Sequence, residues 1–91
     1  MATIYKTNGE CSTATPKNGI AFSLKELQSI VGGYIELIDL YNGDLMVINE
    51  EGKLIGLDIN AKATLIFSKS FPMAFDVIVG DALVCNKSQI K

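Results

Sequence analysis

The sequence predicts an α+β domain: a mostly antiparallel sheet of four to five strands with two helices on one face, in the ferredoxin-like order βαββαβ. Three observations support this prediction. Two apolar runs within residues 31–57 flank Asn42-Gly43, the strongest short signal of a β-hairpin. A helix-start motif precedes these runs, and a second helical segment with a further apolar run follows them. At 91 residues, the chain has the length of a single domain, 1–91.

The N-terminal part predicts one strand followed by a loop. Residues 2–6 hold the bulky pair Ile4-Tyr5 and are expected to form a short strand. Asn8-Gly9 is a turn signal. Residues 11–19 are small and polar and include Pro16, so we expect a loop there.

The first helix has clear start and stop signals. Ser23 followed three residues later by Glu26 matches the capping box, in which each residue's side chain bonds the other's backbone N–H. Phe22 before the cap is expected to pack on Leu27 one turn inside the helix. Gly32-Gly33 ends the helix, because glycine best suits the left-handed position after the last turn.

A β-meander is predicted next. Residues 34–40 and 45–48 are expected to pair through a two-residue type I′ turn at Asn42-Gly43. The second run is apolar without alternation, as in a strand that is covered on both faces. Residues 54–57 are expected to add a short third strand after the turn NEEGK.

The C-terminal part predicts a second helix and a last strand. Asp58 or Asn60 would cap a helix at residues 61–68, which Phe71-Pro72 terminates. Residues 76–86 form either a strand pair or one bent strand, with a turn or bulge at Gly80-Asp81. Residues 87–91 are expected to fray.

Composition argues against nucleic-acid readers. The chain is 48% hydrophobic and 20% charged with a net charge of −2, and it contains neither histidine nor arginine. Arginine is the usual residue for bidentate contacts to phosphates and bases, and the lysines here form no basic run. We therefore expect no binding to duplex DNA or RNA.

The sequence also predicts no membrane association. No apolar segment reaches the roughly 18 residues of a membrane span, and the N-terminus lacks the pattern of a signal peptide. We therefore expect a cytoplasmic protein. In that compartment Cys11 and Cys85 are expected to remain free thiols, although a disulfide between them stays an alternative.

The residues for catalysis are scarce, and we expect no enzyme. Without histidine there is no neutral-pH general base and no Ser–His or Cys–His pair. Two cysteines alone do not complete a zinc site. The chain also lacks the phosphate-binding motif G-x-x-x-x-G-K-[ST]. The sequence therefore implies no catalytic residue, metal or cofactor.

Self-association is predicted from packing. If both helices cover one face of the sheet, the other face exposes residues such as Met46, Ile48 and Ile78. Exposed apolar patches of this kind usually mark an interface, so we expect a homo-oligomer, most simply a symmetric dimer. Loops that cover this face are the alternative.

Three blocks carry a family resemblance: LQSIVGGYIELIDL, NEEGKLIGLDINAKAT and DVIVGDALV, within residues 27–84. Their order and spacing resemble the pattern LQxxVGGYIE…NEEGKxxGLxxNxxA…DVIVGD of a family of small domains of unknown function found in phages, plasmids and other mobile elements. The resemblance implies kinship and carries no activity. Asp58 stands where proline is common, and Ala61-Lys62 where basic residues are common. This departure argues against an anionic ligand held by arginine at the second helix.

The polar and aromatic members of this pattern supply the candidate ligand-binding residues, which are Tyr34, Glu36, Asn49, Lys53 and Asn60. Tyr34 would stack on a ring, the two asparagines would hydrogen-bond it, and Lys53 with the second helix's N-terminus would hold a phosphate. Structural interpretations compete: Asn60 as a helix cap, and Glu36 paired with Lys53 across the meander.

Two function classes follow, with plain self-association as a third. The first is a non-enzymatic protein of a phage or mobile element that sequesters a small, nucleotide-like ligand to counter host defence, as the resemblance implies. The second is an interaction module or inhibitor that binds a host protein through an apolar sheet face or an unpaired edge. The third is a structural homo-oligomer.

Overall fold

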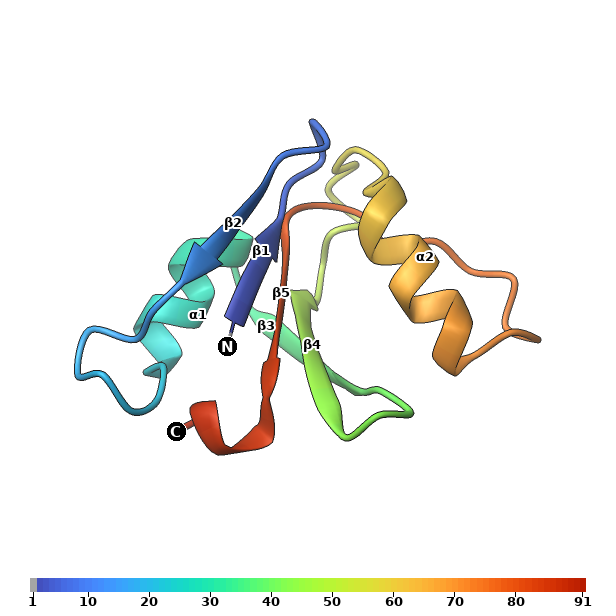
Figure 1. Cartoon of the computed structure of the whole chain (residues 1–91). Helices are drawn as coiled ribbons and strands as arrows, with labels where there is room; N and C mark the ends of the chain where they lie inside the picture. Colours follow the sequence, from blue (N-terminus) through green and yellow to red (C-terminus); the bar gives the residue numbers. More distant parts are fainter. Residues whose placement is uncertain (1) are drawn as a thin grey trace.

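The computed structural model describes residues 2–91 and confirms an α+β domain (Figure 1). One five-stranded sheet has the order β2-β1-β5-β4-β3, with every neighbouring pair antiparallel. The extra strand β2 and this strand order depart from the ferredoxin-like arrangement. The elements in chain order are β1 (Ala2–Tyr5), β2 (Cys11–Ala14), α1 (Leu24–Val31), β3 (Ile35–Asp39), β4 (Asp44–Asn49), α2 (Ala61–Ser70), β5 (Ala82–Asn86) and the 3₁₀ helix η1 (Lys87–Gln89).

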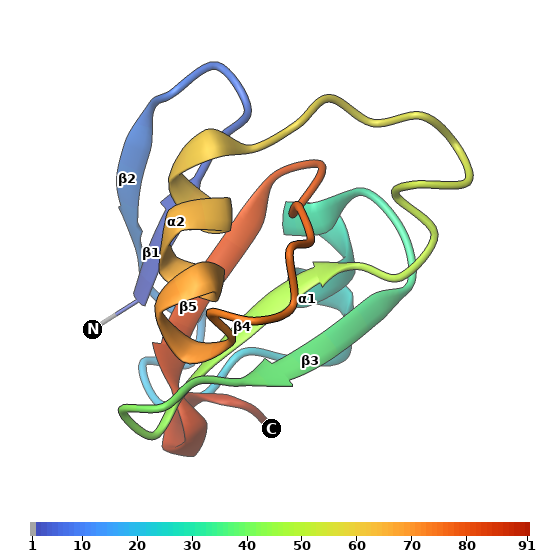
Figure 2. The same ribbon diagram turned by 90° about the vertical axis from the view of Figure 1, so that its right-hand side faces the viewer.

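The two helices cover opposite faces of the sheet, so the prediction that both lie on one face was wrong. Figure 2 shows α2 in front of the sheet and α1 behind it. Alternate residues of β4 point to the two sides: Val47 joins the cluster under α1, and Met46 joins the cluster under α2. Met46 and Ile78, which were expected on a bare face, are buried under α2. The bare-face argument for an oligomer therefore does not hold.

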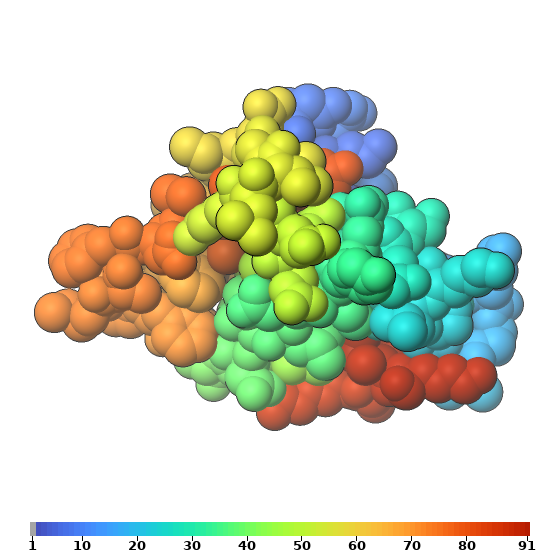
Figure 3. Space-filling model, turned by 180° about the vertical axis from the view of Figure 1, so that it is seen from behind, coloured from blue at the N-terminus to red at the C-terminus, as the bar shows by residue number. Residues whose placement is uncertain are grey.

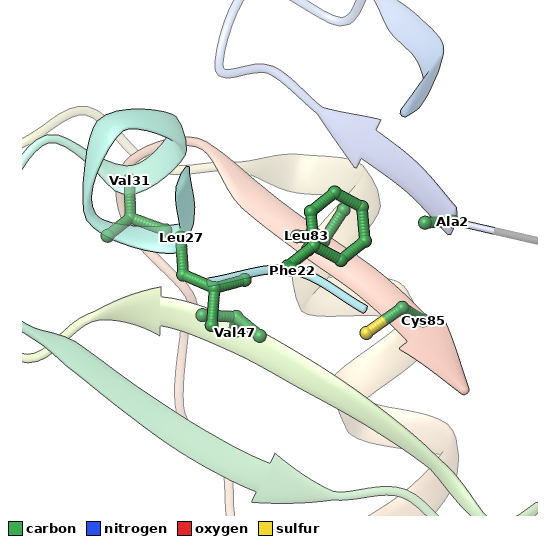
Figure 4. Packing of buried hydrophobic residues seen from close by; sticks show 7 residues of the cluster. All are labelled: Ala2, Phe22, Leu27, Val31, Val47, Leu83 and Cys85. Atoms are coloured by element: carbon green, nitrogen blue, oxygen red, sulfur yellow. The ribbon is translucent and has the colours of Figure 1, made fainter. Parts of the chain in front are cut away.

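The α1 side holds the larger core, which Figure 4 shows from close by. Its buried members come from β1, α1, β4, β5 and the segment before α1. They are Ala2, Phe22, Leu27, Val31, Val47, Leu83 and Cys85. Phe22 and Leu27 pack in the same cluster, as the staple predicted.

Helix α1 begins and ends where the sequence predicts. Ser23 caps it, and the full capping box with Glu26 is present. Gly32 ends it with φ +80°, in the left-handed region that glycine enters without a steric penalty.

The predicted turn type at Asn42-Gly43 was wrong. Leu40 donates its N–H to the Asp44 carbonyl at 2.9 Å, so the hairpin loop has three residues. Gly43 has φ +90°, whereas Asn42 keeps a negative φ, which excludes type I′. The Asn42 side chain instead accepts the Asp44 N–H at 3.1 Å.

Two further elements differ from the sequence-based expectation. Residues 11–14 form an edge strand, not a loop, because they continue a hairpin from β1 with Thr3 opposite Thr13. Residues 54–57 are a series of turns, not a strand: Ile55 donates to Glu51 and Leu57 to Gly52. Their apolar side chains Leu54 and Ile55 are exposed.

The last third of the chain consists of α2, an extended loop, the strand β5 and η1. Asn60 caps α2, and Phe71 ends it. Of residues 76–86, only β5 joins the sheet; Val79 forms an isolated bridge with Ile59, and Gly80 turns the chain with φ +79°. Residues 87–91 are not frayed, because η1 is capped by Asn86 and Ile90 bridges Phe22.

Candidate functional site

A cavity of about 360 Å³ lies on the α2 side of the sheet, and we call it the α2-face pocket. This volume falls within the range of small-molecule sites. It is bounded by β3, β4, the C-terminal half of α2, the 50–60 loop and the 71–81 loop. Its lining residues are Glu36, Ile38, Ile48, Asn49, Glu50, Lys53, Leu54, Phe67, Phe71, Asp76, Val77, Ile78 and Val79.

The interior of the pocket is apolar and aromatic. Ile38 and Ile48 reach it because they occupy the α2-facing positions of β3 and β4. Phe67 and Phe71 lie one helical turn apart, with ring centroids separated by 4.9 Å and planes tilted by 30°. These side chains provide a surface for a flat or hydrophobic group.

The charged residues of the pocket are mainly acidic. Glu36, Glu50 and Asp76 contribute carboxylates, and Lys53 contributes the single ammonium group among the lining residues. Lys53 forms an ion pair with Asp76, which joins the 50–60 and 71–81 loops. The predicted pairing of Lys53 with Glu36 was therefore wrong, because Asp76 takes the ammonium group.

The Lys53–Asp76 pair changes the pKa of the Asp76 carboxyl group. The hydrogen bond from Lys53 lowers the pKa of the Asp76 carboxyl group, and the N–H of Val77, which donates at 2.8 Å, lowers this pKa further. Both side chains remain about half exposed, so solvent screens the pair and limits its contribution to stability. The Lys53 ammonium is nevertheless already engaged by Asp76.

The structure brings three of the five predicted site residues to this pocket. Glu36, Asn49 and Lys53 all line it. Asn49 is buried, and its amide is engaged by the fold: it donates to the Val31 carbonyl at 3.2 Å and accepts the Glu51 N–H at 2.8 Å.

The other two predicted residues lie elsewhere. Tyr34 is exposed and lines a separate hollow of about 280 Å³ beside the Gly32-Gly33 turn. Asn60 is 0% exposed and lines none of these cavities. Lys53 lines the pocket beside Phe67 in the C-terminal half of α2, whereas Asn60 caps the N-terminus of this helix. The two therefore do not form the phosphate site that the sequence predicted.

The residues that sequence reasoning missed come from the segment after α2. Phe71, Asp76 and Val77 line the pocket, and Met73 and Phe75 beside them are 80% and 90% exposed. Figure 3 shows this segment, in orange, standing out from the body of the molecule. The signal was present in FPMAF (residues 71–75): an apolar run directly after a helix, without the polar residues typical of a loop.

Phe75 adopts a conformation that non-glycine residues rarely take. Its φ is +50°, and no other non-glycine residue among 2–91 has a positive φ. A bulky side chain in this region is strained, and such strain concentrates at functional segments. The exposed apolar tip is therefore a second feature that calls for a functional explanation.

A larger cavity of about 530 Å³ lies on the opposite side, between α1 and the β1–β2 hairpin. Lys17, Lys25 and Glu26 are its charged residues. Both oxygens of Glu26 accept backbone N–H groups, of Ser23 and Lys17, each at 2.9 Å. Because these contacts build the start of α1, the Glu26 carboxylate of this cavity serves the fold.

The remaining chemistry of residues 2–91 is limited. Cys11 is exposed, Cys85 is buried, and both thiols are free. Burial raises the pKa of the Cys85 thiol, and the nearby charge of Asp44 raises it further. No group of three or more potential metal-ligating side chains occurs in this part of the chain. Neither helix within it is long and apolar enough to cross a membrane.

Comparison with known proteins places the chain in a family without assigning an activity. Searches of curated proteins and of solved structures each find no match. A family model described as a domain of unknown function (DUF3846) matches residues 3–90, which is nearly the whole described structure. The chain therefore belongs to the DUF3846 family of small domains of unknown function.

Proposed function

We propose that this chain is a non-enzymatic binding protein whose α2-face pocket holds a small ligand with a flat apolar body and a cationic or neutral polar group. One observation carries the proposal: an apolar, aromatic pocket is surrounded by carboxylates whose single ammonium neighbour is already paired. Apolar pockets with a few convergent polar groups are the usual form of a small-molecule site.

Charge decides which ligand fits. A cationic group would be attracted by Glu36 and Glu50, which face no ion-pair partner among the described residues. A phosphate would meet those same carboxylates and would have to compete with Asp76 for Lys53. A nucleobase or nucleoside therefore suits the pocket better than the phosphate-bearing nucleotide that the sequence suggested.

The side chains of the pocket support binding of a ligand and not catalysis on it. The chain has no histidine, and the pocket contributes no cysteine, serine or tyrosine side chain. Its carboxylates lack the neighbouring base or nucleophile that acid–base or covalent catalysis uses. Sequestration of a ligand requires none of these groups.

The biological setting that we propose comes from the resemblance in sequence. A small protein of a phage or other mobile element, acting in the host cytosol, would remove a signalling molecule of host defence by binding it. The compact pocket and the absence of a catalytic constellation among its lining residues agree with that role.

A matched pair of probes tests the charge argument. Tryptamine and indole-3-acetate share an aromatic ring system and carry opposite charges. We expect calorimetric titration to show tighter binding of tryptamine, because the pocket is acidic. Equal binding of the two probes, or tighter binding of indole-3-acetate, would contradict the proposal.

The variant Glu36→Gln tests the same site from the protein side. Removing this exposed carboxylate should weaken tryptamine binding about three- to fivefold, the effect of one solvent-exposed ion pair, and leave indole-3-acetate unaffected or improved. Glu10→Gln is the matched control, since Glu10 lies in the β1–β2 turn and outside the pocket. An equal loss in both variants would show that the effect is not local.

The second candidate is an interaction module, and the exposed tip around Met73 and Phe75 favours it. Phenylalanine and methionine are enriched at protein interfaces, and backbone strain concentrates at functional segments. The double variant Met73→Ser/Phe75→Ser should keep its fold and lose any host protein that the wild type retains. Retention of the same partner by this variant would exclude the tip as the contact.

A further inference from the structure

Strand β3 forms one edge of the sheet, and its outer side is free. It pairs with β4 alone, in a continuous register from Ile35 opposite Asn49 to Asp39 opposite Leu45. Figure 2 shows β3 along the outer border of the sheet. The backbone groups on this border are therefore available for pairing with another strand.

Hydrogen bonds at the two ends of the β3–β4 hairpin identify which backbone groups point outward. Leu40 donates to Asp44, and Glu50 donates to Tyr34, each at 2.9 Å. Because hydrogen-bonded pairs alternate in an antiparallel ladder, Glu36 and Ile38 bond inward to β4. The N–H and C=O groups of Ile35, Leu37 and Asp39 then face away from the sheet.

This edge carries only part of the protection that is usual for an edge strand: Glu36 and Asp39 are charged, and Asp39 forms an ion pair with Lys87 at 3.3 Å. It contains no proline, lysine or bulge, and the Leu37 side chain is 46% exposed. Native proteins normally block such edges, because an open apolar strand recruits another chain. The opposite edge, β2, presents the polar residues Ser12 and Thr13 instead.

We propose that β3 pairs with β3 of a second copy of this chain, antiparallel, about a two-fold axis at Leu37. The two sheets would join into one continuous sheet. This inference rests on the edge alone and does not depend on the proposed ligand. It also restores the expectation of a symmetric dimer on a different surface from the one that the sequence suggested.

The number of paired residues and the charges together favour this register over the alternatives. With the axis at Leu37, Ile35 faces Asp39 of the partner subunit, and Glu36 faces Ile38 of the partner subunit. All five residues of β3 are paired, and no carboxylate lies directly opposite another. An axis at Glu36 or at Asp39 would place two carboxylates face to face, which destabilises a cross-strand pair.

The proposed pairing brings the partner to the α2-face pocket. Glu36 and Ile38 line that pocket and occupy the α2-facing positions of β3. Facing Glu36, the partner subunit's Ile38 would therefore lie at its edge. The two pockets of the dimer would meet across the axis.

Proline substitution tests the edge without breaking the fold. Leu37→Pro removes an outward N–H and leaves the bonds to β4 in place, and proline is tolerated at such positions. Thr13→Pro is the matched control: Lys6 donates to Glu10 at 2.9 Å, so the alternation places the Thr13 N–H outward on the other edge. Light scattering should give twice the chain mass for the wild type and Thr13→Pro, and the single-chain mass for Leu37→Pro.

Two results of the light-scattering experiment would contradict the β3–β3 dimer. A wild type that stays monomeric from micromolar to millimolar concentration would overturn the proposal. A Leu37→Pro variant that keeps its circular-dichroism spectrum and remains dimeric would overturn it as well. If Leu37→Pro unfolds, the cross-linking experiment below tests the dimer instead.

Cross-linking tests the register directly. In a Cys11→Ser background, Leu37→Cys places two thiols opposite each other at the axis, within the roughly 4.4–6.8 Å Cα separation that disulfides span. Asp39→Cys is the matched control, because its opposite residue is Ile35 of the partner subunit. We expect an oxidised dimer for Leu37→Cys alone. Dimers from neither variant, or from Asp39→Cys in preference, would overturn the proposal.

Discussion

Asn60 connects three segments of the chain through one side chain. Its amide donates to the Tyr5 carbonyl at 2.8 Å and to the Gly80 carbonyl at 2.9 Å, and its oxygen accepts the Ala63 N–H at 3.1 Å. It is fully buried, and all of these contacts are satisfied. The pattern LxxNxxA that contains it therefore has a structural explanation.

The substitution Asn60→Ala should lower the free energy of unfolding by about 2–4 kcal/mol, because it removes a helix cap and the amide that donates to the Tyr5 and Gly80 carbonyls. Asn60→Ser keeps a capping oxygen and should recover about 1 kcal/mol of this loss. Asn42→Ala, in an exposed turn, is the control for chemical denaturation. An Asn60→Ala variant as stable as Asn42→Ala would contradict this role.

At the scale of elements, the start of α1 predicts a pH dependence. Hydrogen bonds from the backbone N–H of Ser23, and next of Lys17, lower the pKa of the Glu26 carboxyl group. A pKa that is lower in the folded state means that the ionised carboxylate stabilises the fold above the unfolded-state value near 4.5. This contribution is lost as the pH falls through the folded-state pKa.

The variant Glu26→Gln should therefore show a smaller loss of stability than the wild type when the pH is lowered from neutral to acidic values. Denaturation curves across that range measure the difference. Glu51→Gln is the control, because the Glu51 side chain is exposed and forms no hydrogen bond within residues 2–91. Identical acid sensitivity of Glu26→Gln and the wild type would contradict the capping argument.

Helix ends were predictable because their signals are local. The capping box at Ser23 and the glycine after Val31 act within one turn, and both are present. Strand β2 was not predictable, because its residues are polar and only the hairpin with β1 makes them a strand. Residues 54–57 were wrongly predicted as a strand because they are apolar. Their backbone forms turns, and the side chains of Leu54 and Ile55 stay exposed.

At the scale of the whole molecule, the prediction for β4 was right, and the assumption that both helices cover one face of the sheet was wrong. The unbroken apolar run of β4 predicted a strand covered on both faces, and its residues do face both cores. Helical periodicity shows that a helix has an apolar side, but it does not show which face of the sheet that side covers. The placement of α2 opposite α1 required the full set of connections.

The candidate site was predictable only in part. The turn motif brought Glu36, Asn49 and Lys53 to one pocket, since β3 and β4 are neighbours in sequence and in space. Asp76 and Phe71 come from the loop after α2, and only the fold brings them there. Because Asp76 pairs with Lys53, the ligand that we propose has the opposite charge to the one expected from the sequence.

The most direct test of the account is a two-dimensional ¹⁵N NMR titration of the intact chain with tryptamine. We expect shifts at the amides around the α2-face pocket, such as Ile48, Phe71 and Ile78, and weaker shifts in Glu36→Gln. Shifts clustered instead around Lys25 and Ile30 in the opposite cavity would contradict the account, as would no shifts at saturating tryptamine.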